Sequence, residues 1–155
     1  MTDAGGEPRW EGRSRARAAA LQVLYECEVG DLAPGEALAV LDASGEADAP
    51  PLSSPDREFV ERLVRGIRAE TAALDERIGR AARHWRVERM ALLDRLVLRL
   101  AVHEWLTMPE TPPRVVINEA IELARAFSGE DAARFVNGVL DGVYRTLRDE
   151  GRVVD

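Results

Sequence analysis

The chain has 155 residues, of which 46% are hydrophobic, so it can bury the core of one domain or of two subdomains. Its formal net charge of −7, taken alone, argues against nucleic acid as a partner, and no apolar stretch approaches the roughly 20 residues of a membrane span. One cysteine and two histidines exclude an internal disulfide and a structural zinc site.

Residues 1–12 are polar and contain a Gly-Gly pair, which predicts a disordered tail. This segment has no apolar core of a secretory signal, so we expect a cytoplasmic protein. A first helix is predicted over residues 14–29 and is ended by Gly30. Its buried stripe, at helical spacing, consists of Ala16, Ala20, Val23, Leu24 and Cys27. A short helix over 35–41 and a flexible loop over 42–54 follow.

The pair Ser54-Pro55 predicts a helix start, with the serine as the cap and the proline in the first turn. This helix should continue to about residue 85, with a break at Gly66 or near Thr71. The next helix, over residues 87–106, is apolar almost all round its centre, so we expect it to be the central, most buried helix.

Prolines mark the turn at 109–113, after which helical spacing resumes over 116–126. Ser128 is predicted to cap the last helix, with Asp131 three residues on, and residues 148–155 to be a frayed tail. Gly138 and Gly142 lie inside this helix, where close helix packing is the expected reason for a glycine. No segment alternates like a strand, so the fold class is all-α.

Nothing in the sequence forms a catalytic constellation. The pair His103-Glu104 lacks the second histidine of a metalloprotease motif, and no phosphate-binding loop is present. Cys27 lies on the buried stripe of the first helix, where a core role is expected.

The charge distribution is more informative than the total. All 21 basic residues are arginine, which a genome rich in G and C would produce. Arg13, Arg15 and Arg17 lie together without an intervening acid, whereas residues 28–61 carry nine acids and only Arg57. A local basic patch with a modest, salt-sensitive affinity for RNA is therefore compatible with the acidic total.

Four segments together resemble the bacterial NusB family of transcription antitermination factors. They read RSRARAAALQVLY over 13–25, LDRLVLRLAVHE over 93–104, VINEAIELARAFSGED over 116–131 and RFVNGVLD over 134–141. The resemblance covers about residues 13–147. The part from Asn118 to Asp141 is long and specific, so it carries most of the resemblance.

The resemblance implies a helical bundle of about seven helices in two packed subdomains, over about 13–85 and 86–147, without catalysis or a cofactor. Such proteins pair with NusE, a small ribosomal protein, and the pair recognises single-stranded boxA RNA. This assembles a complex that lets RNA polymerase read through terminators, notably in ribosomal RNA operons. Because ribosomal proteins are generally basic, an acidic chain would attract one electrostatically.

The resemblance also implies two sets of site residues. The RNA side would comprise Arg13, Arg15, Arg17, Gln22, Arg125, Phe127, Asp131, Arg134, Phe135 and Asn137. The NusE side would comprise Tyr25, Glu26, Asp94 and Leu98. Arginines would bond phosphates, aromatic rings would stack on unpaired bases, and the amides would read base edges. Asp131 would oppose phosphate. Asp94, on an otherwise apolar helix, calls for a cationic partner.

Alternatives remain for several of these residues. Phe127 and Phe135 could be core residues, and Asn118 and Asn137 could instead bond backbone between helices. Arg13 and Arg17 are favoured as RNA ligands because their sequence neighbours offer no ion pair.

Two other functions remain open as well. NusB-like domains also serve as RNA-binding modules of ribosomal RNA cytosine methyltransferases. A helical interaction module without an RNA role, for example a homodimer through the central helix, is the other alternative.

Overall fold

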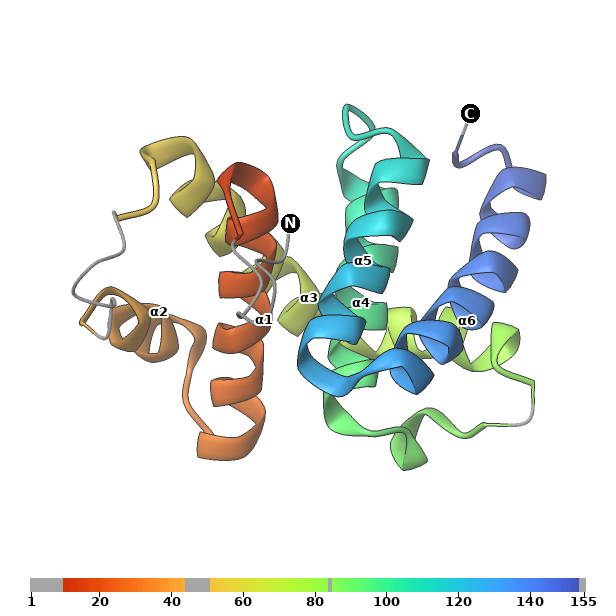
Figure 1. The fold of residues 1–155 in the computed structure, drawn as a ribbon, viewed down its shortest axis with the longest axis horizontal. Coiled ribbons are helices and arrows are strands. Elements are labelled where there is room, and N and C mark those ends of the chain that lie inside the picture. Colours follow the sequence, from red (N-terminus) through yellow and green to blue (C-terminus); the bar gives the residue numbers. More distant parts are fainter. Residues whose placement is uncertain (1–9, 44–50, 84, 154–155) are drawn as a thin grey trace. The chain divides into compact units, whose positions relative to one another are not determined.

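The computed structural model describes residues 10–43, 51–83 and 85–153, and over these residues it is entirely helical apart from its turns (Figure 1). The elements are α1 (Gly12–Gly30), α2 (Pro34–Ala43), α3 (Ser54–Ala81), the 3₁₀ turn η1 (Val87–Arg89), α4 (Leu92–Thr107), α5 (Pro113–Ser128) and α6 (Glu130–Asp149). The described part contains no strand, which confirms the all-α prediction. No helix in it is long and apolar enough to cross a membrane.

By its internal contacts the chain divides into two compact units, residues 1–66 and 67–155, and this division falls inside α3. One helix therefore runs through both units. It is interrupted at Glu70, whose φ of −112° and ψ of 16° are not helical. This agrees with the predicted break near Thr71, whereas Gly66 keeps the helical conformation.

In the first unit, α1 contributes the buried stripe that its spacing predicts. Its five members are at most 2% exposed, which also confirms Cys27 as a core residue. α1 packs against α2, and the first half of α3 adds Phe59, Val60, Leu63 and Val64 to the buried residues. Burial of these side chains is the main stabilising contribution to this unit.

In the second unit, α4 packs against both α5 and α6, and α5 and α6 pack against each other. Ten consecutive residues of α4, from Leu96 to Trp105, are at most 6% exposed. This confirms α4 as the most buried helix. Its apolar face is covered within the chain, so a homodimer through this helix is not supported.

Several helix ends differ from prediction. The helix predicted over 87–106 begins only at Leu92, because residues 87–89 form the 3₁₀ turn η1, and α3 ends at Ala81 and not near residue 85.

Two other boundaries differ by one residue. α1 includes Gly30, and the left-handed residue that ends it is Asp31, with φ of 50°. At the start of α3, the cap is Ser53, whose Oγ accepts a hydrogen bond from the Asp56 N–H at 3.2 Å. In both cases an adjacent residue able to adopt the same role takes it.

The corner between α5 and α6 is also tighter than predicted. Ser128 is the last residue of α5 and does not cap α6, because Gly129 alone separates the two helices. Gly129 has φ of 93° and ψ of −177°, a conformation open essentially only to glycine. The predicted capping box is therefore wrong.

The C-terminal segment is ordered further than expected. Beyond α6, the N–H of Arg152 donates to the Leu147 carbonyl and that of Gly151 donates to the Arg148 carbonyl. With Gly151 at φ of 72°, this is a Schellman cap, and Val153 behind it is only 7% exposed. A frayed tail from residue 148 is therefore wrong as far as residue 153.

The predicted tail and loop are only partly described. Residues 1–9 and 44–50 lie outside the described residues, so those parts of the predictions remain untested. At their edges, Gly12 already belongs to α1, and α2 continues through Ala43.

The two glycines of α6 differ from each other. A Cβ at Gly142 would lie 3.2 Å from the Ala81 Cβ, which confirms close helix packing there. A Cβ at Gly138 would meet nothing within 4 Å, so the packing explanation is wrong for Gly138.

Candidate nucleic-acid interface

The arginines at the start of α1 are in contact with α3. The Arg13 Nε lies 3.5 Å from the Asp56 Oδ1, and the Arg13 guanidinium lies 4.2 Å from the centre of the Phe59 ring. The expectation that no ion pair occupies Arg13 is therefore wrong, because its partner comes from another helix. The Arg13 side chain is still 48% exposed, so it can also reach a phosphate.

Arg17 is placed differently from Arg13. It is only 6% exposed, and its guanidinium lies 5.5 Å from the same Phe59 ring. This cation–π geometry gives Arg17 a structural role, so the interpretation of Arg17 as an unoccupied surface arginine is wrong. Arg15 is half-buried and Gln22 is exposed, which leaves Arg13, Arg15 and Gln22 as the accessible polar groups of α1 in the predicted RNA set.

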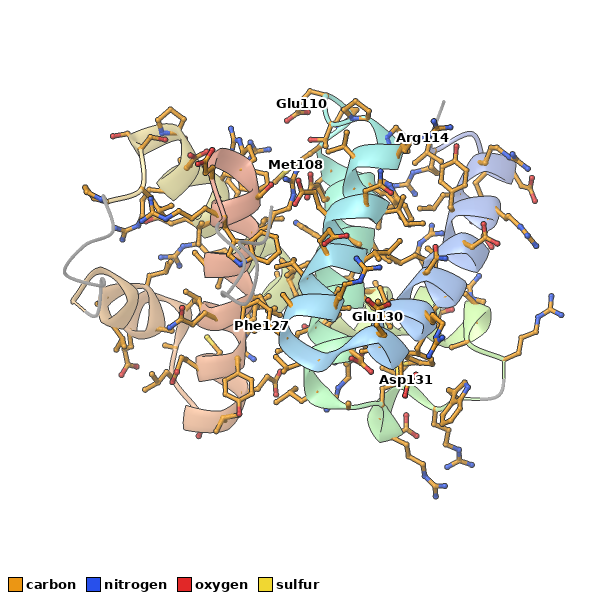
Figure 2. All side chains as sticks on the ribbon, viewed as in Figure 1. Met108, Glu110, Arg114, Phe127, Glu130 and Asp131 are labelled. Carbon is orange, nitrogen blue, oxygen red and sulfur yellow. The ribbon has the colours of Figure 1, made fainter. Side chains whose placement is uncertain are left out.

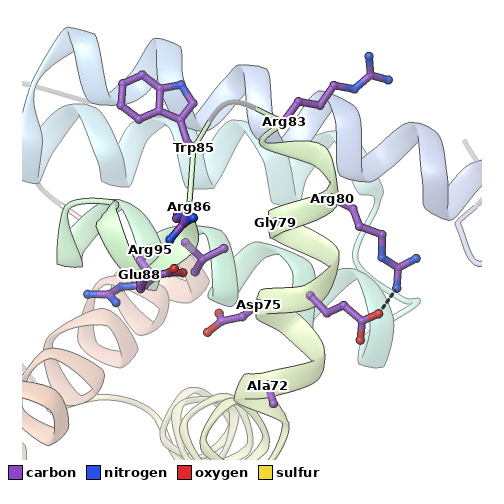
Figure 3. A pocket seen from close by; sticks show the side chains of 11 residues that line it. Ala72, Asp75, Gly79, Arg80, Arg83, Trp85, Arg86, Glu88 and Arg95 are labelled. Carbon is purple, nitrogen blue, oxygen red and sulfur yellow. Dashed lines mark hydrogen bonds and ion pairs between the residues drawn. The ribbon is translucent and has the colours of Figure 1, made fainter.

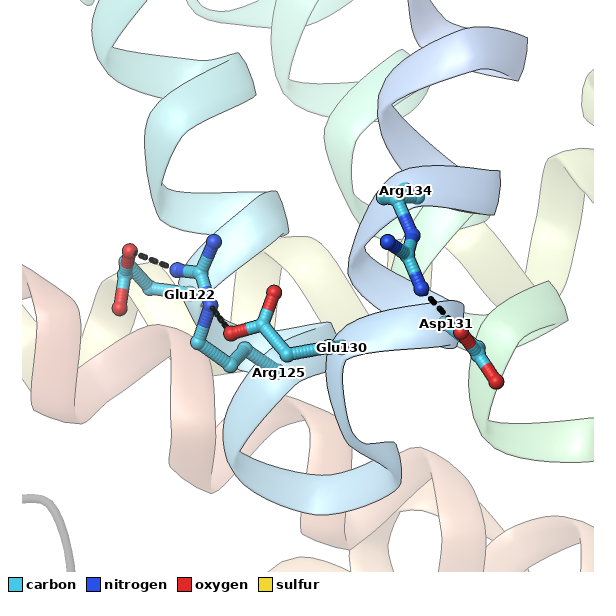
Figure 4. Close-up of polar contacts among 5 residues, drawn as sticks. All are labelled: Glu122, Arg125, Glu130, Asp131 and Arg134. Atoms are coloured by element: carbon cyan, nitrogen blue, oxygen red, sulfur yellow. Dashed lines mark hydrogen bonds and ion pairs between the residues drawn. The ribbon is translucent and has the colours of Figure 1, made fainter.

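In the second unit, Arg125 is held between two acids at the α5–α6 corner (Figure 4). Its Nε donates to the Glu130 Oε1 at 2.6 Å, and its Nη1 donates to the Glu122 Oε1. These hydrogen bonds, the one to Glu130 first, raise the pKa of Arg125 above its ordinary value. Arg125 is thus oriented before any ligand arrives, and a phosphate would have to compete with carboxylates.

Arg134 and Asp131 form a second pair, on the first turns of α6 (Figure 4). Arg134 Nη2 donates to the Asp131 Oδ1, and the side chains are 75% and 94% exposed. In so exposed a setting this pair contributes little to stability. The Asp131 carboxylate is therefore accessible and can repel an RNA phosphate, as the sequence predicts.

The aromatic candidates have separate environments. Phe127 is 48% exposed at the end of α5 (Figure 2), so the core alternative is wrong for Phe127. Phe135 is half-buried and packs edge to face against Trp85, with ring centres 5.7 Å apart and an interplanar angle of 79°. Phe127 is thus the more accessible ring for stacking on a base.

The two asparagines of the long motif, Asn118 and Asn137, are both exposed. Within the described part of the chain, neither side chain forms a hydrogen bond to backbone. The helix-bridging alternative is therefore not supported, and both amides are accessible to a ligand.

The predicted partner residues divide into accessible and inaccessible ones. Tyr25 is 38% exposed and Glu26 is half-buried, but Leu98 is 0% exposed. A direct partner contact by Leu98 is therefore wrong: the residue belongs to the core formed by α4.

Asp94, on the first turn of α4, has a partly buried carboxyl group in an environment that disfavours its charge. Its Oδ1 is buried and has no hydrogen-bond partner among the described residues. Burial raises the pKa of the Asp94 carboxyl above the ordinary value of 3.8. A buried carboxylate oxygen without a donor is destabilising, and a cationic partner would relieve it.

Trp85 is a surface aromatic residue that the sequence prediction missed. It is 59% exposed, although a side chain of this size usually finds cover. The sequence did contain a signal, because Arg83, Arg86 and Arg89 surround this tryptophan. Aromatic residues interleaved with basic ones are typical of nucleic-acid-binding segments.

Metal chemistry finds no support in the part of the chain that the structure describes. No cluster of three or more His, Cys, Asp or Glu side chains there could hold a metal ion. His103 and Glu104 are both buried in α4.

The fold and these surfaces define a small all-helical protein with accessible arginine, amide and aromatic side chains on α1, α5 and α6. The NusB family model matches residues 14–145. The chain belongs to the NusB family.

Similar proteins agree with this assignment. The transcription antitermination protein NusB of Symbiobacterium thermophilum is 42% identical over 88% of this chain and 91% of that protein. The NusB protein of Solibacter usitatus is 45% identical over 87% of this chain and 90% of its own length.

Solved structures give the same result. T. maritima NusB matches with a TM-score of 0.75 and 30% identity, over 88% of this chain and 93% of that one. A crystal structure of the antitermination factors NusB and NusE in complex with dsRNA matches with a TM-score of 0.74 and 26% identity, over 86% of this chain and 96% of that one.

Proposed function

We propose that this chain is a transcription antitermination factor that pairs with NusE, binds boxA RNA and promotes read-through by RNA polymerase, especially in ribosomal RNA operons. The family match over residues 14–145 carries this proposal. It is supported by the relatives named as antitermination proteins and by the NusB–NusE structure with RNA. The proposed role involves no catalytic step and is exercised in the cytoplasm.

The proposed RNA contacts are the accessible members of the predicted set. In the first unit they are Arg13, Arg15 and Gln22. In the second unit they are Arg125, Phe127, Arg134, Phe135 and Asn137, with Asp131 beside them as the acid that opposes phosphate. For NusE we propose Tyr25, Glu26 and Asp94. On a chain of net charge −7, a basic partner is attracted electrostatically, while RNA is attracted only locally.

The direct test measures binding of a boxA-type RNA to this chain with and without NusE, with a scrambled RNA of equal length as the control. We expect the pair to bind boxA RNA more tightly than either protein does alone. Equal binding of boxA and scrambled RNA by the pair would exclude sequence-specific antitermination. In that case a general RNA-binding module would be the better description.

Replacing Arg15 with alanine is expected to weaken RNA binding and to reduce the slope of log affinity against log salt by about one unit. The reason is that one phosphate contact, with its released counterions, is lost. Affinity measured at several salt concentrations checks this. An unchanged slope would remove Arg15 from the interface.

Replacing Asp131 with asparagine is expected to tighten RNA binding. This substitution removes a negative charge beside the proposed RNA surface and releases Arg134 from its ion pair. We expect a gain of about two- to fivefold at low salt, decreasing as salt screens the charge. Asp141→Asn is a matched control, because Asp141 also pairs with an arginine of α6, Arg145. Equal effects of the two variants would contradict a local role of Asp131.

Replacing Asp94 with asparagine is expected to have opposite effects on stability and on NusE binding. Because the folded-state pKa is raised, ionised Asp94 destabilises the fold above that pKa, and this effect disappears as the pH falls below the unfolded value. At pH 7 the variant should gain up to about 1 kcal/mol, a small value because the group is partly exposed.

The same Asp94 variant should bind NusE more weakly, because the charge that faces the basic partner is gone. Denaturation at pH 7 and at about pH 4, together with NusE titration, checks both effects. A gain in stability without a loss of NusE affinity would take Asp94 out of the partner interface.

A further inference from the structure

The second unit contains a hollow of about 760 Å³ beside Trp85, which we call the Trp85 groove (Figure 3). The last turns of α3 form one wall, and the segment from Trp85 through η1 to the start of α4 forms the other. This volume is in the range of sites that hold a nucleotide-sized ligand.

The charges in the Trp85 groove are not balanced among themselves. Two of its acids are already paired: Asp75 binds Arg99 through two hydrogen bonds of 2.7 and 2.8 Å, and Glu76 binds Arg80 at 2.8 Å. Among the described residues that line the groove, Glu88 is the one remaining acid. The groove is therefore electropositive although the chain as a whole is acidic.

Four arginines line the groove; Arg80 is paired with Glu76, so Arg83, Arg86 and Arg95 supply the positive charge. Two of them lie on the wall that carries Trp85. Arg86 is exposed and has no ion-pair partner among the described residues. Arg95 lies deeper, and its Nε is buried without a hydrogen-bond partner within the described part of the chain. A buried guanidinium N–H without an acceptor is unfavourable, so an anionic ligand would relieve it.

Trp85 adds a stacking surface to this positive charge. Its ring is 59% exposed and is held edge to face by Phe135, at 5.7 Å between ring centres. An aromatic ring fixed in this way loses little freedom when a base stacks on it. Phe135 is one of the proposed RNA contacts, so the Trp85 groove adjoins the proposed RNA surface of the second unit.

We propose that the Trp85 groove binds one further nucleotide of the same single-stranded RNA, with its base stacked on Trp85 and its phosphate held by Arg86 and Arg95. This inference rests on the proposed function and extends it, because neither Trp85 nor the arginines of the groove belong to the predicted RNA set.

The test uses the chain with NusE and a labelled boxA RNA, and it records RNA anisotropy and tryptophan emission together. RNA is expected to quench the emission of Trp85. The other two tryptophans remain in Trp85→Phe, which should keep most of the affinity but lose the quenching. Trp85→Ala should weaken binding by about 5- to 150-fold, the range for loss of one stacked base.

The phosphate contact is tested separately by Arg86→Ala, which should reduce the salt slope by about 0.7. Arg89→Ala is the matched control, because Arg89 is an exposed arginine of the same segment that does not line the groove. The salt slope of RNA binding should be the same in this variant as in the unmodified protein.

RNA binding shown by anisotropy without a change in Trp85 emission would overturn this inference and leave the proposed function intact. Equal slopes for the Arg86 and Arg89 variants would also overturn it. If anisotropy showed no RNA binding at all, the proposed function and this inference would both be wrong.

Discussion

Replacing Asp75 with alanine is expected to lower the free energy of unfolding by about 3 kcal/mol, the lower end of the range for breaking a buried ion pair. Asp75 accepts two hydrogen bonds from Arg99, at 2.7 and 2.8 Å, which joins α3 to α4. The Arg99 side chain is only 7% exposed, so Asp75→Ala takes two charge-assisted hydrogen bonds from a cation that water reaches poorly. Urea denaturation of both proteins measures the difference.

The neighbouring residue provides the control for this prediction. Glu76 also pairs with an arginine of its helix, Arg80, but the two side chains are 68% and 62% exposed. Glu76→Ala should therefore change stability by no more than about 0.5 kcal/mol. Equal losses in the two variants would show that burial of Arg99 does not determine the effect.

Replacing Gly142 with leucine is expected to destabilise the fold by about 3 kcal/mol, the upper part of the usual range for overpacking. Even a Cβ at this position would lie 3.2 Å from the Ala81 Cβ and 3.7 Å from the Ala81 backbone. A longer side chain would push α6 away from the end of α3. The shift in the thermal unfolding midpoint checks this.

Gly138→Ala is the matched control for Gly142, four residues earlier on the same helix. No atom lies within 4 Å of an added Cβ there, so alanine should stabilise the helix by about 0.5–1 kcal/mol. The opposite signs test the packing difference between the two positions. Stabilisation by both substitutions would contradict the close contact with Ala81.

The helices and their buried faces could be predicted from the sequence, because burial follows the helical period along each segment. The stripe of α1 and the near-complete burial of α4 both follow from this rule. Helix ends could be predicted less well, because neighbouring residues compete for the same role: Ser53 and not Ser54 caps α3. Moving the end of a helix by one residue changes the free energy of folding only slightly.

The interface residues could be predicted less well, because their environment depends on other helices. Neither Asp56 nor Phe59 is near Arg13 and Arg17 in the sequence, yet these residues of α3 determine how accessible the two arginines are. For Leu98, the sequence shows an apolar residue on an apolar helix and cannot show which face is covered. Only tertiary packing identifies it as core.

The one-residue corner at Gly129 has a consequence for the kinetics of RNA release. A single glycine joins α5 to α6. Phe127 on α5 and Arg134 on α6 are therefore not separated by a flexible linker. A ligand that contacts both would not have to order a loop first, so little entropy is lost on binding. A longer linker inserted at this corner should therefore shorten the lifetime of the RNA complex more than it slows its formation.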